Sequence, residues 1–256
     1  MILAIDIGNT NIVIGKYKGD TLSYVCRMMT DAHKSESEYA VNIQSILSLD
    51  KNNSEHIEGA IISSVVPPLT KTIQNAINML YGVEAIVVGP GVKTGINLQV
   101  DNPAQVGADL ICACVGAYNK YSSPVLIIDM GTATKIMVVD ANGTFMGVSI
   151  APGVELSLKA LSGGTAQLPQ ISLEAPSRVI AKNTVECMKS GVIFGNASMI
   201  DGMIERIEKE LGFSVTLVAT GGYANAVIPH CQSNITIDDD LVLDGLYIIY
   251  NKNVKN

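Results

Sequence analysis

Residues 1–11 of the chain read MILAIDIGNTN and join a short apolar run to a polar turn. The run, Ile2–Ile5, is too short for a helix and predicts a buried strand. The turn combines a carboxylate, a glycine and small hydrogen-bonding side chains: Asp6, Gly8, Asn9, Thr10 and Asn11. It would let backbone amides approach an anion, while the carboxylate holds a hydrated Mg²⁺ that bridges phosphate oxygens. Taken alone, however, the stretch is more simply explained as a strand that ends in an Asp-Gly turn.

A second stretch of the same chemistry follows about half a chain later. It is an apolar run, Val125–Ile128, followed by Asp129-Met130-Gly131-Thr132-Ala133-Thr134, which aligns with Asp6-Ile7-Gly8-Asn9-Thr10-Asn11. Each turn leads into an alternating apolar run, with Ile12 and Ile14 in the first and Ile136 and Val138 in the second. Two such strand–turn–strand units favour duplicated domains that face each other and clamp a phosphate chain between their turns.

Composition limits the classes of protein that fit. The 256 residues suffice for two domains, and 48% hydrophobic with 16% charged residues predicts a full core. The net charge of −7 argues against nucleic acid as the main partner, and no apolar run reaches the roughly 20 residues of a membrane span. Five cysteines without framework spacing, and the lack of a basic region before the first apolar run, predict a cytoplasmic protein. No zinc-binding pattern is present in the sequence.

The first half of the chain alternates strands and helices. A hairpin is expected over residues 12–28, a helix capped by Ser35 or Ser37, a strand over 59–66, a helix over 69–80 that Gly82 ends, and a strand over 85–88. Asn102 and Pro103 are expected to open a helix that runs through Asp109 to about Tyr121. This alternation after a hairpin predicts an α/β domain with a mixed sheet over residues 1–122.

The second domain is expected over residues 123–256. Its hairpin turns at Asp140–Gly143, and a long helix begins at Asn183 or Thr184, is interrupted near Gly191–Gly195 and ends at Leu211. A strand over 215–218 is expected to lead into Thr220, Gly221 and Gly222, where an adenosine can lie against the paired glycines. A helix over 240–250 follows.

Asp109 allows two interpretations. A carboxylate in the first turn of a helix interacts favourably with the helix dipole, which is an ordinary structural role. The functional alternative is a base at the mouth of the cleft between the domains. The residues alone favour the structural role slightly.

Six motifs in order resemble the type III pantothenate kinases. They are DIGNTN at 6–11, NPAQVGAD at 102–109, DMGTAT at 129–134, IAPG at 150–153, NT at 183–184 and TGG at 220–222. The resemblance implies the actin and sugar-kinase superfamily, with two ribonuclease-H-like domains and the active site in the cleft between them. It also implies a homodimer that phosphorylates the primary hydroxyl of pantothenate with ATP, the first step towards coenzyme A.

The same resemblance implies a role for each matched position. Asp6 would lie near Mg²⁺ and the phosphates, and Gly8, Asn9, Thr10, Asn11, Gly131 and Thr132 would cradle the phosphates, with Thr220, Gly221 and Gly222 at the nucleotide. Asp109 would be the base that accepts the proton of the attacking hydroxyl. Asp129 would bind a monovalent cation, K⁺ or NH₄⁺. Val100, Gly107, Ala108, Asp109, Leu110 and Thr184 fall where the family binds pantothenate, and Thr184 would act from the partner subunit.

Three positions depart from the family pattern. Leu110 stands where the family has the arginine that pairs with the pantothenate carboxylate, Val100 replaces a tyrosine, and Gly147-Val148 replaces a Gly-Gly pair. Losing a buried charge partner costs on the order of 2–5 kcal/mol. Two hypotheses therefore stand: a kinase for pantothenate or a related alcohol, and a nucleotide-binding regulatory paralogue without kinase activity.

Overall fold

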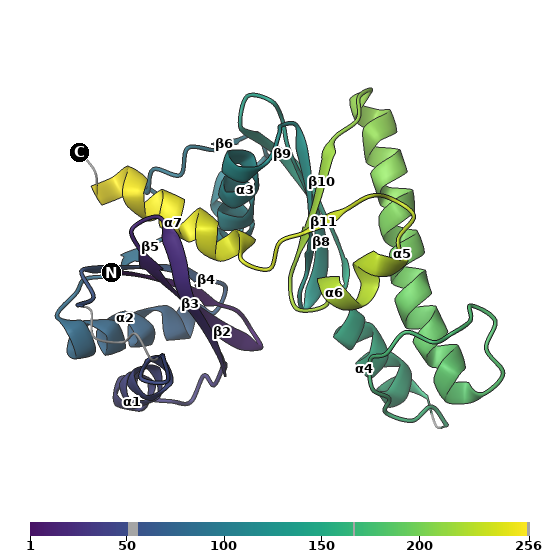
Figure 1. Cartoon of the computed structure of the whole chain (residues 1–256), viewed down its shortest axis with the longest axis horizontal. Coiled ribbons are helices and arrows are strands. Elements are labelled where there is room, and N and C mark those ends of the chain that lie inside the picture. The colour runs from purple at the N-terminus through teal and green to yellow at the C-terminus, as the bar shows by residue number, and fades with distance from the viewer. Residues whose placement is uncertain (51–55, 166, 255–256) are drawn as a thin grey trace. The chain divides into compact units, whose positions relative to one another are not determined.

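The computed structural model describes residues 1–50, 56–165 and 167–254. These form two compact units: Met1–Asn119 together with the stretch from Asp240, and Lys120–Asp239 (Figure 1). The elements of the first unit are β1 (Ile2–Ile7), β2 (Asn11–Lys18), β3 (Thr21–Met29), α1 (Glu36–Leu47), β4 (Gly59–Ser64), α2 (Pro67–Tyr81), β5 (Ile86–Val87), β6 (Asn97–Leu98), the 3₁₀ turn η1 (Pro103–Gln105), α3 (Ala108–Lys120) and α7 (Leu241–Val254). The second unit contains β7 (Val125–Met130), β8 (Ala133–Val139), β9 (Thr144–Pro152), α4 (Val154–Gly164), α5 (Thr184–Leu211), β10 (Thr216–Thr220), α6 (Ala224–Val227), η2 (Ile228–His230) and β11 (Thr236–Ile237).

The strand β1 lies in the middle of the first sheet, whose order is β3-β2-β1-β4-β5. It pairs antiparallel with β2 and parallel with β4, so the sheet is mixed as predicted. Leu3, Ile5 and Ile7 alternate along β1 and are fully buried in the core that α1 and α2 cover. Because side chains alternate across a strand, Ala4 and Asp6 point to the opposite face.

Local chemistry fixes the ends of the two covering helices. Ser35 caps α1, and its side chain and that of Glu38 form a reciprocal capping box. Pro67 and Pro68 open α2, and Gly82 ends it in the left-handed conformation with φ of 66°. These boundaries confirm the predicted helices.

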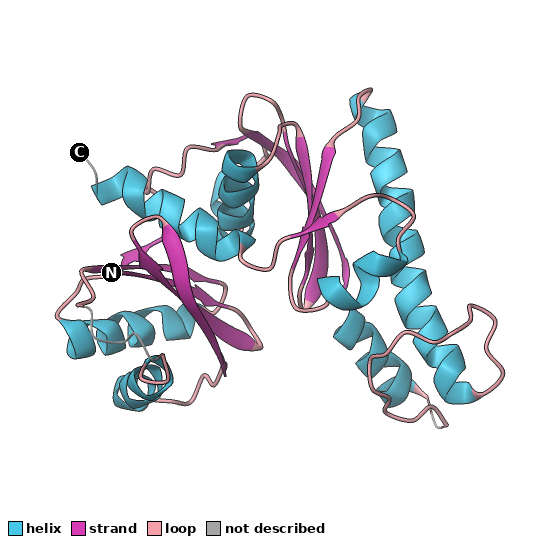
Figure 2. Cartoon of the chain, viewed as in Figure 1, coloured by secondary structure: helices cyan, strands magenta, loops and turns pink. Residues whose placement is uncertain are grey.

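The second sheet repeats the arrangement of the first. Those of its strands that belong to the second unit follow one another in the order β9-β8-β7-β10-β11, with β7 antiparallel to β8 and parallel to β10. The core on one face combines β7 residues such as Leu126 and Ile128 with Ile193 and Ile200 of α5. Figure 2 shows the helices and strands of the chain coloured by secondary structure. The duplicated mixed sheets confirm the predicted α/β fold with two ribonuclease-H-like domains. No described helix is both long and apolar enough to cross a bilayer.

Two predicted helices differ from the structure. Asn102 caps only the short turn η1, because the chain at Val106 returns to an extended conformation and α3 begins at Ala108. The predicted interruption near Gly191–Gly195 is wrong, since α5 is continuous from Thr184. Val192 and Ile193 are buried in the core, and this packing outweighs the low helix propensity of the glycines.

The last helix, α7, belongs to the first unit, whereas residues 123–256 were expected to form one domain. Two glycines explain the packing, because a Cβ on Gly245 would collide with the Cys112 backbone and one on Gly116 with Leu241. The helices α3 and α7 therefore approach at backbone distance. The Tyr247 ring also stacks on Tyr17 of β2 with 4.2 Å between ring centroids.

Candidate active site

The turn between β1 and β2 is held by backbone hydrogen bonds. The Gly8 amide donates to the Asn11 carbonyl at 3.0 Å. Thr30, just after β3, fixes the turn from the side: its hydroxyl donates to the Gly8 carbonyl at 2.6 Å and its amide to the Thr10 carbonyl at 3.0 Å. Asn9 and Thr10 are exposed. The turn therefore presents small polar side chains from a fixed backbone, and Thr30 is a supporting residue that sequence reasoning missed.

Asp6 and Asp109 both raise the pKa of the same buried thiol, that of Cys112. Asp6 is the fifth residue of β1 and lies beside Ser63 of β4, while Asp109 stands in the first turn of α3. Cys112 is fully buried, and its pKa is raised well above the usual value, first by burial and then by the negative charges of Asp6 and Asp109. Two carboxylates about a hundred residues apart in the sequence are thus brought to one region of the first unit.

The carboxylates of this region fit a hydrated magnesium ion. Mg²⁺ is usually bound by one or two carboxylates and keeps several of its waters. The described residues contain no group of three or more potential metal ligands, so a cage made wholly of protein side chains is not present there. Asp6, half-buried at the end of its strand, is the residue that would hold the ion.

The residues expected to bind pantothenate are only partly gathered. A Cβ at position 107 would collide with the carboxylate oxygen Oδ1 of Asp109, so Gly107 leaves room for the side-chain conformation that Asp109 adopts. Ala108 and Val100 are half-buried, whereas the Leu110 side chain is buried, with 7% exposed. Thr184 is exposed at the first turn of α5 in the second unit.

The turn between β7 and β8 is enclosed by close backbone approaches. The Gly131 amide donates to the Ala133 carbonyl at 3.2 Å, and the Gly153 amide donates to the Thr132 carbonyl at 3.2 Å. A Cβ on Gly153 would lie 2.5 Å from the Gly131 carbonyl oxygen, so only glycine fits there. Gly153 is therefore a supporting residue, which the sequence places in the IAPG motif at 150–153 without assigning it a role at the site.

The Thr220–Gly222 segment lies beside the same turn. Thr220 pairs with Asp129 in the parallel ladder of β10 and β7. Gly221 has φ of 95°, and a Cβ there would lie 2.7 Å from the Met130 backbone. The structure thus brings together Asp129, Gly131, Thr132 and the Thr220–Gly222 turn, as a nucleotide site in this unit requires.

Asp129 forms an ion pair with Lys135, a residue that sequence reasoning did not single out. The ammonium Nζ lies 2.6 Å from Asp129 Oδ2, and Asp129 is buried with 9% of its surface exposed. Asp129 stands opposite Lys135 in the hairpin, whereas Asp6 stands opposite the uncharged Val13. The difference arises because the second turn, residues 131–133, is shorter than the first, residues 8–11. A monovalent cation at Asp129 fits poorly beside an ammonium group, and the expected K⁺ or NH₄⁺ stays a prediction.

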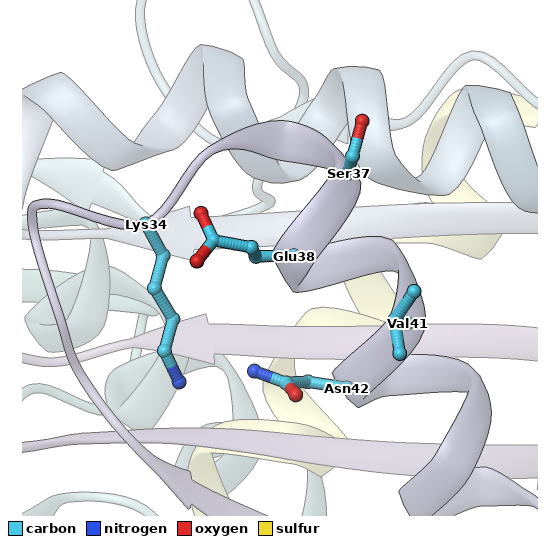
Figure 3. A pocket seen from close by; sticks show the side chains of 5 residues that line it. All are labelled: Lys34, Ser37, Glu38, Val41 and Asn42. Atoms are coloured by element: carbon cyan, nitrogen blue, oxygen red, sulfur yellow. The ribbon is translucent and has the colours of Figure 1, made fainter.

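A shallow pocket of about 330 Å³ lies on α1, away from these turns in the sequence. Figure 3 shows its lining side chains, which come from the start of α1 and the residue Lys34 before it. Glu38 in this pocket accepts hydrogen bonds from the Ser35 backbone and hydroxyl, and these lower its pKa. None of the predicted site residues lines the pocket.

Comparison with known proteins identifies a family. The family model of type III pantothenate kinase matches residues 2–206. A type III pantothenate kinase from Exiguobacterium sp. is 42% identical over 255 residues, covering 100% of both chains.

Solved structures share the fold at lower identity. The crystal structure of a putative Baf family transcriptional activator from Campylobacter jejuni aligns with a TM-score of 0.62 at 20% identity, covering 99% of this chain and 100% of that one. MreB 5 of Spiroplasma citri, bound to AMPPNP, aligns with a TM-score of 0.54 at 12% identity, covering 100% and 98%. From the family match over most of its length and the full-length relative, this chain belongs to the type III pantothenate kinase family.

Proposed function

We propose that this chain transfers the γ-phosphoryl group of ATP to the primary hydroxyl of pantothenate, giving 4′-phosphopantothenate in the first step of coenzyme A synthesis. Family membership and the name of the full-length relative support this reaction. The structural observation that carries the proposal is that Asp6 lies beside Ser63 in the β1–β4 ladder while Asp109 stands one turn before Cys112 in α3, and both carboxylates raise the pKa of the Cys112 thiol. In this proposal the Asp6 carboxylate holds the metal ion at the phosphates, and the Asp109 carboxylate accepts the proton of the acceptor hydroxyl.

The two turns bind the nucleotide in this proposal. Asp6 holds Mg²⁺, which when bound neutralises charge on the phosphate oxygens. Asn9 and Thr10 donate hydrogen bonds from the first turn, and Gly131 and Thr132 contribute backbone and hydroxyl donors from the second. The Thr220–Gly222 turn lies against the adenosine. Phosphoryl transfer mainly requires this positioning and charge neutralisation.

Asp109 is the general base of the proposed reaction. It accepts the proton of the acceptor hydroxyl as the new oxygen–phosphorus bond forms. Gly107 leaves the space that the Asp109 carboxylate occupies.

The acceptor half of the site supports a second candidate, a kinase for a related alcohol. Leu110 is buried, so position 110 offers a ligand carboxylate no charge and no exposed donor. An unpaired carboxylate is costly to desolvate. Pantothenate must therefore find another cation, or the preferred acceptor lacks the carboxylate.

The protein acts in this proposal as a cytoplasmic homodimer, with Thr184 reaching pantothenate in the partner subunit. Exposed apolar side chains in the second unit support an interface between copies: Ile150 of β9, Leu156 of α4 and Val185 of α5. Burying such side chains against a second copy removes apolar surface from water.

A coupled assay of ADP release with ATP, Mg²⁺ and pantothenate tests the reaction. We expect Asp109→Asn to lower kcat by about 10²–10⁴-fold while the Kd for ATP stays within twofold. Asp101→Asn, the same change in the exposed loop before η1, is the matched control and should keep full activity. Wild-type release of ADP with a panel of carboxylate-free alcohols but not with pantothenate would select the second candidate. An unchanged rate in Asp109→Asn would refute the role of the base.

A further inference from the structure

The carboxylate of Asp129 is already neutralised by a charge from its own hairpin. Lys135 donates from Nζ to Asp129 Oδ2 at 2.6 Å. The other oxygen, Oδ1, lies on the side of the Gly131 turn, 3.6 Å from where a Cβ on Gly131 would be. The ion pair therefore lies directly beneath the turn that contacts the phosphates in the proposed function.

We propose that the Lys135 ammonium supplies the single positive charge at Asp129 that the family resemblance assigns to K⁺ or NH₄⁺, so that neither ion is needed for nucleotide binding or turnover. The inference rests on the proposed function only for the turnover part. The nucleotide-binding part needs only a phosphate group at the Gly131 turn.

Burial explains why Asp129 needs this charge. A buried carboxylate without a charge partner is strongly unfavourable, and next to phosphates its negative charge would also repel the ligand. The side chains of Asp129 and Lys135 are 13% and 18% exposed, so both charges are largely withdrawn from water. A cation is required here, and the chain provides one.

The ladder holds the ammonium in place. Lys135 lies within β8, paired on one side with Asp129 of β7 and on the other with Ile150 of β9. Because the Lys135 backbone is paired with strands on both sides, the residue cannot move away from Asp129 as a loop residue could. A free K⁺ at the same carboxylate would stand a few ångströms from a like charge, which repels it.

The lysine also offers more than a metal ion would. An ammonium group has three N–H donors, and Lys135 directs one of them to Asp129 Oδ2. With nucleotide bound in the proposed site, the same ammonium group can also donate to a phosphate oxygen above the turn. K⁺ supplies charge without directed donors, so the lysine combines neutralisation with positioning.

The test compares the Kd for ATP, measured by calorimetry, and kcat in buffers whose only monovalent cation is K⁺, NH₄⁺ or choline. For the wild type we expect changes of less than twofold among the three buffers. For Lys135→Met we expect ATP binding in choline to weaken on the order of tenfold or more, with K⁺ or NH₄⁺ restoring part of the loss. Lys135→Arg keeps the charge and should stay independent of the cation.

Lys120→Met is the matched control. Lys120 also pairs with a buried carboxylate, Asp238, at 2.7 Å, and Tyr121 donates to the same carboxylate at 2.8 Å. We expect no cation-dependent change in this variant.

Wild-type ATP binding that weakens tenfold or more in choline would overturn the inference, as would a Lys135→Met variant equal to wild type in every buffer. If Lys135→Met fails to fold, the cation dependence of ATP binding in the wild type and in Lys135→Arg tests the inference. Because ATP binding is measured without an acceptor, failure to phosphorylate pantothenate would refute the proposed function and leave this inference standing.

Discussion

Replacing Gly153 by alanine should displace the second phosphate turn. The added Cβ would lie 2.5 Å from the Gly131 carbonyl oxygen and closer still to that of Thr132, whereas ordinary contact begins at 3.4 Å. Both neighbours are backbone, so no side-chain rotation relieves the clash. Residues 131–132 must move by about 1 Å, and a misplacement of this size costs on the order of 10²-fold in rate.

The assay is steady-state kinetics with ATP as the varied substrate, together with the thermal midpoint of unfolding. We expect kcat/KM for ATP to fall by about 10²-fold in Gly153→Ala. Gly195→Ala is the control, because Gly195 lies inside α5 with nothing within 4 Å of an added Cβ. That change should leave kinetics unaltered and stabilise the protein by roughly 0.5–1 kcal/mol. A Gly153→Ala enzyme within threefold of wild type would show that the turn does not hold the phosphates.

Two further predictions concern buried groups of the first unit. Asp50→Ala removes the ion-pair partner of the Lys16 ammonium, whose side chain is 1% exposed, and should lower the free energy of unfolding measured in urea by about 3–5 kcal/mol. The apolar double variant Lys16→Met with Asp50→Leu should recover most of this loss. Equal stability of Asp50→Ala and the wild type would contradict the prediction. Burial raises the pKa of the Cys112 thiol well above its usual value, whereas Cys187 is exposed. A thiol reagent at pH 8 should therefore modify Cys187 rapidly and Cys112 only on unfolding. Rapid modification of Cys112 in the native protein, located by mass spectrometry, would contradict its burial.

Features set by local chemistry could be predicted from the sequence. Ser35 caps α1 and Gly82 ends α2 because caps and left-handed ends depend on one or two residues. The two Asp-x-Gly turns could be predicted because a strand followed by a polar turn is a short-range pattern that occurs twice. Asp129, Gly131 and Thr220–Gly222 therefore come together in the second unit as expected.

Features that depend on register or on distant packing could not be predicted. With a turn as long as the first, Asp129 would face Ile136, which aligns with Val13, whereas the turn that is one residue shorter brings Lys135 opposite Asp129. Sequence alignment of the two turns does not reveal this difference in register. The burial of Leu110 depends on how α3 packs, and α3 packs against α7, which follows it by more than a hundred residues. Family motifs identify which residues matter but do not determine these contacts.

The placement of α7 has a consequence for folding during synthesis. The second unit is continuous in sequence from Lys120 to Asp239, whereas the first unit is completed only by the helix from Leu241. At 5–20 residues per second, roughly 7–27 s separate the synthesis of α3 from that of α7. Throughout that interval the face of α3 that carries Gly116 lacks the helix α7, which covers it in the folded unit. The unit that leaves the ribosome first is therefore finished last, and the second unit is free to fold before it.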